Sequence, residues 1–340
     1  MAQTSLLKWA QFCLEYCMTC NATCRHCCVE SSPHRREKMG IERAKRYIDQ
    51  AAGFQCFREL GIGGGEALIF YDEILEIMRY AHTRHRFSIT ISTNGYWART
   101  PEVAAQKIAE MKEAGLRSFL VSVDDFHQEF VKLEPIRNLL KAASDLDVSV
   151  YLQSIVSKSS RIDEIRRALS PYDPRFQWGE FPCIPAGFAK TQVPKDDYIL
   201  VDEIPREGCT ISRLVRVKVD GKVKPCCGAG VPERLVIGDL EREPLGVILD
   251  RINRDPIINA IAIWRGPRYL AQVLAEEGYP EALTGPYAGA CHACGHILND
   301  PKLLAVLQRR LGESEGELRD NRRIVERDHY FPTSYHLAPP

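Results

Sequence analysis

The sequence predicts an α/β fold in which parallel strands alternate with helices. Between residues 9 and 178, short apolar stretches rich in β-branched residues alternate with longer stretches whose apolar residues recur every three or four positions. Six such repeats are typical of strands joined by crossover helices, in a barrel or in an open doubly wound sheet. A complete eight-stranded barrel takes about 250 residues, so six repeats fit a partial (β/α)6 barrel. Periodicity alone does not separate this barrel from a flavodoxin-like sheet.

Local sequence signals place the individual elements. The predicted helix at 41–54 carries Ala44 and Ile48 on one face. The third predicted helix opens with Thr100-Pro101, a cap followed by a first-turn proline, and closes at Gly115. The predicted strands are 9–16, 56–62, 87–93, 118–123, 148–156 and 175–178, and the remaining helices are 71–82, 136–145 and 161–169.

Composition limits the classes of function. The chain has 45 Lys and Arg residues and 45 Asp and Glu residues, so no overall charge favours nucleic acid or an anionic membrane. The first twenty residues lack the pattern of a secretory signal, and no uninterrupted apolar stretch of about 18 residues could span a bilayer. We therefore expect a cytoplasmic protein without a nucleic-acid or membrane partner. In a reducing compartment, the 13 cysteines indicate metal ligation or catalysis rather than disulfides.

Three cysteines near the start of the chain are spaced for an iron–sulfur cluster. They lie in the run Cys20-Asn-Ala-Thr-Cys24-Arg-His-Cys27, with gaps of three and then two residues. Cuboidal clusters normally take four cysteine ligands, so three thiolates on one loop leave one iron open to a substrate or cofactor. Structural zinc sites prefer a closed set of four ligands, which makes this triple a poor zinc site.

This run resembles the CxxxCxxC signature of the radical S-adenosylmethionine (SAM) superfamily. The resemblance implies a 4Fe–4S cluster on Cys20, Cys24 and Cys27, whose open iron binds the methionyl group of SAM. It also implies reductive cleavage of SAM to a 5′-deoxyadenosyl radical, which takes a hydrogen atom from the substrate. His26 stands at the position that the family places near the adenine. An external electron donor of the flavodoxin or ferredoxin type would supply the reducing electron.

Polar and glycine-rich motifs follow three predicted strands at their carboxyl ends, where parallel α/β folds bind ligands. Each motif has an ordinary alternative as a turn or a helix cap, but their order matches the family, whose GGE motif resembles the glycine-rich one. The motifs are Gly63-Gly64-Gly65-Glu66, Ser92-Thr93-Asn94-Gly95 and Ser122-Val123-Asp124. The resemblance implies SAM-binding roles for Gly64, Gly65, Glu66, Ser92, Asn94, Ser122 and Asp124. His127 follows closely and is interpreted as a solvated loop histidine, with a proton donor or acceptor as the alternative.

A second cysteine group lies beyond residue 185, where prolines interrupt the alternation. Cys209 and Cys226 flank a predicted hairpin, and Cys291 and Cys294 follow far downstream. This arrangement resembles the SPASM/twitch extension of some radical SAM enzymes, and it implies an auxiliary 4Fe–4S cluster with four cysteine ligands. Cys227 is an alternative to Cys226, and the same four thiolates could hold a structural zinc ion.

These interpretations divide the chain into a radical SAM core barrel at 1–185, a small α+β cluster domain at 186–310 and a charged helical tail at 311–340. A fully ligated auxiliary cluster suits electron transfer, so we expect an oxidoreductase that performs a net oxidation. We expect a small-molecule substrate from natural-product biosynthesis, since Cys20 comes too early for a preceding peptide-recognition domain. The alternatives are maturation of a ribosomally made peptide with a separate recognition partner, and a non-catalytic iron–sulfur or zinc scaffold.

Overall fold

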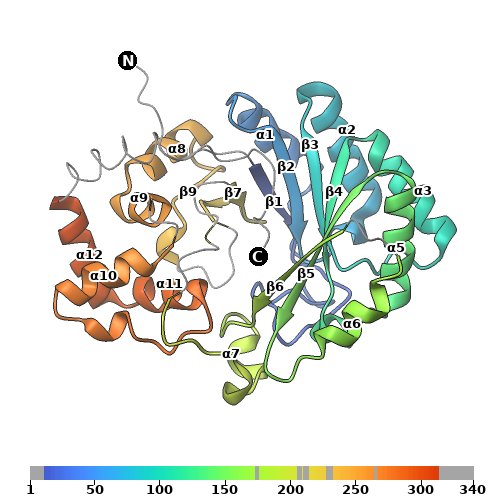
Figure 1. The fold of residues 1–340 in the computed structure, drawn as a ribbon. Helices are drawn as coiled ribbons and strands as arrows, with labels where there is room; N and C mark the ends of the chain where they lie inside the picture. The colour runs from blue at the N-terminus through green and yellow to red at the C-terminus, as the bar shows by residue number, and fades with distance from the viewer. Residues whose placement is uncertain are drawn as a thin grey trace.

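The structure is a computed structural model that describes residues 11–172, 176–204, 209, 214–226, 233–263 and 266–313. Figure 1 shows a curved sheet with helices along one side and a second, mainly helical region beyond β7 and β9. Six strands, β1 to β6, lie in chain order, and each pairs in parallel with its neighbours. This arrangement confirms the predicted α/β class and the partial (β/α)6 barrel.

The observed elements agree with the predicted ones to within a few residues. Helix α3 begins as predicted because the Thr100 hydroxyl accepts a hydrogen bond from the Val103 amide. Strand β2 begins at Glu59 rather than residue 56, because a turn closed by the Phe57 amide and the Phe54 carbonyl precedes it. The barrel strands are β1 (Gln11–Cys17), β2 (Glu59–Gly64), β3 (Ser88–Thr93), β4 (Leu116–Ser122), β5 (Ser149–Val156) and β6 (Gln177–Pro182). The helices are α1 (Ile41–Ala52), η1 (Ala67–Phe70), α2 (Tyr71–His85), α3 (Pro101–Glu113), α4 (Asp125–Gln128), α5 (Leu133–Asp145) and α6 (Ile162–Leu169).

The two faces of the barrel sheet differ in character. Along β3, Ile89 and Ile91 are fully buried in the apolar core that the sheet shares with the helices. Thr90 and Ser92 alternate with them and are partly exposed on the opposite face. Thr90 shares a hydrogen bond with Ser118 of β4, with 2.9 Å between the two hydroxyl oxygens. Small polar side chains on this face leave room for a ligand at the carboxyl ends of the strands.

The strands of the C-terminal half extend the barrel sheet. β7 (Leu214–Val217) runs parallel to β1, with Gln11 opposite Leu214. β8 (Lys222–Lys224) and β9 (Gly238–Asp239) then continue the sheet in antiparallel pairing. In the part of the chain that the structure describes, the order is β6-β5-β4-β3-β2-β1-β7-β8-β9. The predicted hairpin is therefore present, and it shares one sheet with the barrel.

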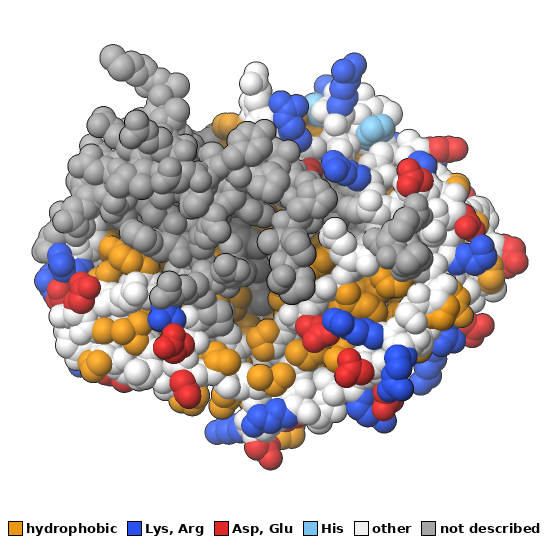
Figure 2. All heavy atoms as spheres, in the orientation of Figure 1, with side chains coloured by type: hydrophobic (Ala, Val, Ile, Leu, Met, Phe, Trp, Pro, Cys, Tyr) orange, Lys and Arg blue, Asp and Glu red, His pale blue; other side chains and the backbone are white. Residues whose placement is uncertain are grey.

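Helices make up most of the remaining C-terminal half. They are α7 (Ala189–Gln192), η2 (Lys195–Asp197), η3 (Glu233–Leu235), α8 (Leu245–Arg254), α9 (Pro256–Ile263), α10 (Arg268–Glu276), η4 (Pro280–Ala282), α11 (Ala290–Asn299) and α12 (Pro301–Glu313). The predicted tail begins inside α12, and the rest of it lies outside the described residues, as does Cys227. Acidic and basic side chains are interspersed on the described part of the face in Figure 2. Within the described ranges, none of the helices has the length and apolar character needed to cross a membrane.

Candidate functional site

The three clustered cysteines lie on a loop that leaves the carboxyl end of β1. The base of this loop is fixed by the segment that follows it, because the Cys20 amide donates to the Ser32 carbonyl at 3.1 Å and the Thr19 hydroxyl donates to the Arg35 carbonyl at 2.9 Å. Inside the loop, the Cys27 amide donates to the Cys24 carbonyl at 3.0 Å. The sulfur-bearing residues therefore sit on a closed turn rather than on an extended strand.

The glycine motif at the end of β2 packs against the backbone that enters this loop. The Gly65 amide donates to the Cys17 carbonyl at 2.7 Å. A Cβ atom on Gly65 would overlap the Thr19 carbonyl, and one on Gly64, whose φ is +125°, would overlap the Cys17 carbonyl. The sequence suggested that these glycines let the backbone approach a ligand. The structure shows that they let two strand ends approach each other, and a direct contact of Gly64 or Gly65 with SAM stays a prediction.

Glu66 joins the ends of β2 and β3. Its side chain is 1 % exposed, and its carboxylate accepts hydrogen bonds from the Asn94 amide at 2.7 Å and from the Thr93 hydroxyl at 3.0 Å. It also accepts from the Leu68 amide at 3.2 Å, which begins η1. Burial raises the pKa of Glu66 to about 7, although these donors oppose the shift. The geometry gives Glu66 a role in fixing the site's frame, and a direct contact with SAM stays a prediction.

Asn94 connects the end of β3 to the cysteine loop. Its side-chain amide donates to the Asn21 side-chain oxygen at 2.9 Å and lies 3.9 Å from the Cys20 sulfur. The structure thus places Asn94 beside the first cysteine, as a site role requires. Ser92 and Ser122 lie on the partly exposed face of β3 and β4, and their contacts with SAM also stay predictions.

Asp124 fixes the chain at the end of β4. Its side chain is fully buried and accepts hydrogen bonds from the His127 amide and ring Nδ1, both at 2.9 Å, and from the Ile155 amide at 3.0 Å. Burial alone would raise the pKa of Asp124, but the facing His127 outweighs it and lowers the value to about 2. Burial likewise opposes the positive charge of His127, yet the Asp124 carboxylate raises the pKa of His127 above its ordinary value. The prediction of a solvated His127 is wrong, because this side chain is 15 % exposed and pairs with Asp124.

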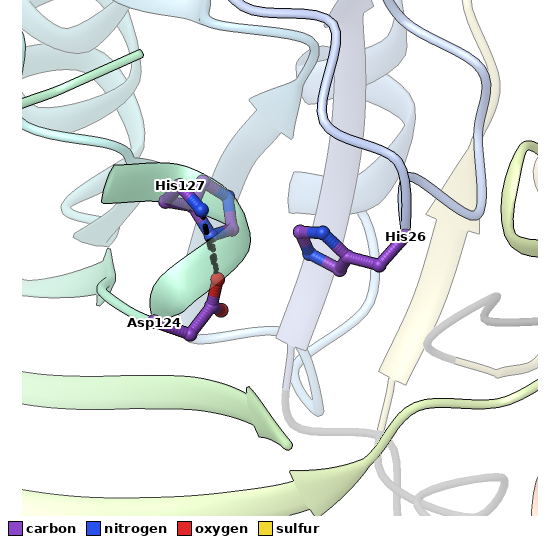
Figure 3. Close-up of side chains that lie close together, drawn as sticks. All are labelled: His26, Asp124 and His127. Atoms are coloured by element: carbon purple, nitrogen blue, oxygen red, sulfur yellow. Dashed lines mark hydrogen bonds and ion pairs between the residues drawn. The ribbon is translucent and has the colours of Figure 1, made fainter. Parts of the chain in front are cut away.

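His26 extends from the cysteine loop toward this pair, as Figure 3 shows. Its ring centroid lies 4.8 Å from those of Phe126 and His127. Burial and the nearby His127 lower the pKa of His26 to about 4, so the ring is neutral at neutral pH. Its Nδ1 atom is buried and has no hydrogen-bond partner among the described residues. A flat, neutral ring beside the cysteines fits the predicted place near an adenine.

Among the described residues, the potential metal ligands His26, Asp124 and His127 bring three ligand atoms within 4.8 Å of one another. Three thiols on one closed turn fit three corners of a cuboidal cluster, and the choice between this cluster and zinc stays a prediction. Asp124 is a poor additional ligand, because three hydrogen bonds already occupy its oxygens.

The four predicted auxiliary ligands all lie in the C-terminal half. Cys226 is buried just after β8, while Cys291 and Cys294 lie three residues apart on α11. Cys209 is partly buried. Ligation of a second cluster, or of a structural zinc ion, by these residues stays a prediction.

A cavity of about 950 Å³ lies between the cysteine loop and α11. Its wall includes Cys28 from the loop and His292 and His296 from α11. Lys224 of β8 also lines it, with its ammonium nitrogen 3.6 Å from a Glu15 carboxylate oxygen. Sequence reasoning missed this cavity, because its walls come from segments more than 200 residues apart.

Comparisons with known proteins agree with this geometry. The chain is 25% identical over 288 residues, 82% of its length and 89% of the relative's, to the "Putative peptide biosynthesis protein YydG" of Bacillus subtilis (strain 168). It is also 30% identical to GTP 3′,8-cyclase of Paenarthrobacter nicotinovorans over 118 residues. This match covers 34% of this chain and 32% of that enzyme. The solved structure of native anSMEcpe with bound AdoMet has the same fold, with a TM-score of 0.56 at 12% identity over 91% of this chain and all of that one. Residues 14–153 match the Radical SAM superfamily. The matched range begins within β1, includes the cysteine loop and ends within β5. Residues 14–153 therefore form a radical SAM domain.

Proposed function

We propose that the chain is a radical SAM enzyme that modifies a peptide. The observation that carries this proposal is the similarity to YydG, which extends over 82% of this chain and 89% of that protein. Because the similarity continues beyond the radical SAM domain, it includes the C-terminal half in which substrate-binding segments would lie. The similarity favours the peptide alternative over the small-molecule oxidation that the sequence suggested first.

The cysteine loop would hold the catalytic centre of this enzyme. Cys20, Cys24 and Cys27 would bind a 4Fe–4S cluster, which together with SAM supplies a carbon radical able to take a hydrogen atom from the substrate. Burial raises the pKa of Cys20 to about 12, so this thiol keeps its proton until it binds iron. Asn94 lies against the loop and His26 is part of it, and both would orient SAM beside the open iron.

The cavity beside the loop has the size and chemistry for part of a peptide chain. Its volume of about 950 Å³ lies at the upper end of the range for small-molecule sites. Lys224, whose ammonium nitrogen lies 3.6 Å from a Glu15 carboxylate oxygen, lines this space together with Lys190 and Lys218. Backbone carbonyls and acidic side chains of a peptide would provide acceptors for these donors.

The C-terminal cysteines would hold an auxiliary 4Fe–4S cluster. Cys209, Cys226, Cys291 and Cys294 would form a complete ligand set, so this cluster would transfer electrons rather than bind substrate. It would accept an electron from the substrate radical, which suits a net oxidation. A flavodoxin- or ferredoxin-type protein would deliver the electron that starts each turnover.

Anaerobic reconstitution with iron, sulfide, dithionite and SAM tests the proposal. We expect release of 5′-deoxyadenosine, and we expect mass spectrometry to detect a changed mass in a short peptide encoded beside the gene. Small alcohols and sugars serve as the comparison substrates. Turnover of these compounds with no change in any such peptide would contradict the peptide assignment, and failure to cleave SAM at all would favour a non-catalytic scaffold.

A further inference from the structure

The short helix α4 and its flanking residues, 124–129, contact the cysteine loop over consecutive residues of both segments. We call residues 124–129 the α4 segment. Glu129 forms an ion pair with Arg25, in which the guanidinium Nη2 and Nε lie 2.7 and 3.1 Å from one carboxylate oxygen. The same guanidinium lies over the Phe126 ring, 5.3 Å from its centroid. Arg25 and His26 stand between the second and third cysteines, so these contacts act on the middle of the ligand loop.

The α4 segment is itself rigidly held by the barrel. Asp124 follows β4 and receives three hydrogen bonds, one of them from the Ile155 amide in β5. Phe126 is 3 % exposed and packs in a small apolar cluster with Cys24. The segment therefore transmits the position of two barrel strands to the loop.

We propose that the α4 segment positions the cysteine loop for SAM binding, and that the ion pair between Glu129 and Arg25 is the contact through which it does so. In this role Glu129 is a positioning residue that acts through Arg25. The proposal goes beyond the peptide assignment, because it concerns a step that precedes any contact with substrate.

The physical reason is the cost of ordering a loop. A loop that samples several conformations binds its ligand with an affinity reduced by the fraction of time it spends in the competent one. The two partners are 44% and 40% exposed, so the ion pair adds little to the stability of the whole fold. The same modest energy can change the fraction of time that one loop spends in its binding-competent conformation. The ion pair acts on this loop between Cys24 and Cys27, where Arg25 lies.

Charge reversal of the two partners provides the test in the full-length, anaerobically reconstituted protein. We would measure the dissociation constant of SAM from the change it causes in the electron paramagnetic resonance spectrum of the reduced cluster. The variants are Arg25→Glu, Glu129→Arg and the doubly reversed pair. Glu134→Gln is the matched control, since Glu134 is an exposed glutamate at the start of α5 with no ion pair among the described residues.

Each single variant should weaken SAM binding by about two- to fivefold, the scale of one exposed ion pair, with unchanged iron content and thermal midpoint. The doubly reversed protein should recover the native dissociation constant to within about twofold. Single variants that match the Glu134→Gln control, or a reversed pair that fails to recover, would overturn the proposal.

Charge reversal can prevent cluster assembly, and milder variants cover that case. Arg25→Gln, Glu129→Gln and their combination form a double-mutant cycle on the same measurement. Additive effects on SAM binding in this cycle would also overturn the proposal, because they would mean that the two residues act separately. None of these measurements needs a substrate, so their outcome is independent of the peptide assignment.

Discussion

At the scale of single residues, Glu66 and Asp124 show how surroundings decide the role of a carboxylate. The sequence assigned both to SAM, and the structure shows both buried and bonded to their own chain. The hydrogen-bond donors to Glu66 are neutral, and burial outweighs both them and the charge of His127, so its pKa rises. Asp124 faces a histidine that can carry positive charge, so its pKa falls. Both residues fix strand ends near the cysteine loop, and no local sequence signal distinguishes that role from ligand contact.

The raised pKa of Glu66 predicts a pH-dependent stability. Because the folded-state pKa of about 7 lies above the ordinary value of 4.5, folding favours the protonated carboxyl. That contribution is present at low pH and is lost as pH rises from about 4.5 to 7, by about 1.4 kcal/mol per pH unit within this window. Urea unfolding of the reduced apoprotein at pH 5, 6, 7 and 8 should show wild type losing stability relative to Glu66→Gln, with a plateau above pH 7. A constant difference between the two proteins would show that Glu66 does not titrate in this range.

Asp124 predicts a stability loss of a different kind. The Asp124 carboxylate accepts hydrogen bonds from three donors. In Asp124→Asn the side-chain NH2 group must face one of these donors, and the negative charge beside His127 is lost. Removing one partner of a buried ion pair costs about 3 kcal/mol. Denaturant unfolding of the apoprotein at pH 6 measures this loss. Asp145→Asn is the control, since the Asp145 pair with Lys141 is exposed and should change stability by less than about 1 kcal/mol.

At the scale of elements, local signals predicted the barrel well and long-range pairing poorly. Helix α3 follows from Thr100 and Pro101, which act within one turn. β7 pairs with β1, so that Gln11 lies opposite Leu214. The sequence of neither short strand indicates which strand it pairs with. The contact between Arg25 and Glu129 escaped prediction for the same reason, because its partners lie 104 positions apart.

The close approach of two strand ends at Gly65 predicts the effect of one methyl group. In Gly65→Ala the new Cβ would overlap the Thr19 carbonyl, so the turn after β2 must shift away from the start of the cysteine loop. We expect a loss of about 1–3 kcal/mol in the free energy of unfolding, typical of overpacking, together with reduced iron incorporation. Gly312→Ala is the control, since a Cβ on that exposed residue of α12 meets no atom within 4 Å. Equal iron content and stability in the two variants would show that the strand ends do not need this contact.

At the scale of the whole molecule, the sequence predicted the superfamily and the barrel. It placed a small-molecule substrate before a peptide, whereas the similarity to YydG favours the peptide. The cysteine run and the strand-end motifs are local, and they are the residues predicted to carry the catalytic chemistry. In the proposed function, substrate choice would depend instead on a cavity whose wall combines Cys28 with Lys224 and His292. The side chains that line this cavity come from segments that are distant in the sequence. Short sequence motifs therefore contain little information about the cavity.

The number of irons per chain tests whether the two halves form one redox enzyme. Two cuboidal clusters would give about eight irons, whereas a zinc ion on the C-terminal cysteines would give about four irons and one zinc. Cys24→Ala should lose the SAM-binding cluster and all release of 5′-deoxyadenosine. Cys291→Ala should retain about four irons and still cleave SAM, but it should form no modified peptide, because the substrate radical would lack an electron acceptor. Metal analysis with product detection on both variants separates these cases. If Cys291→Ala makes product at the native rate, the C-terminal cysteines have a structural role, and the electron leaves the substrate by another route.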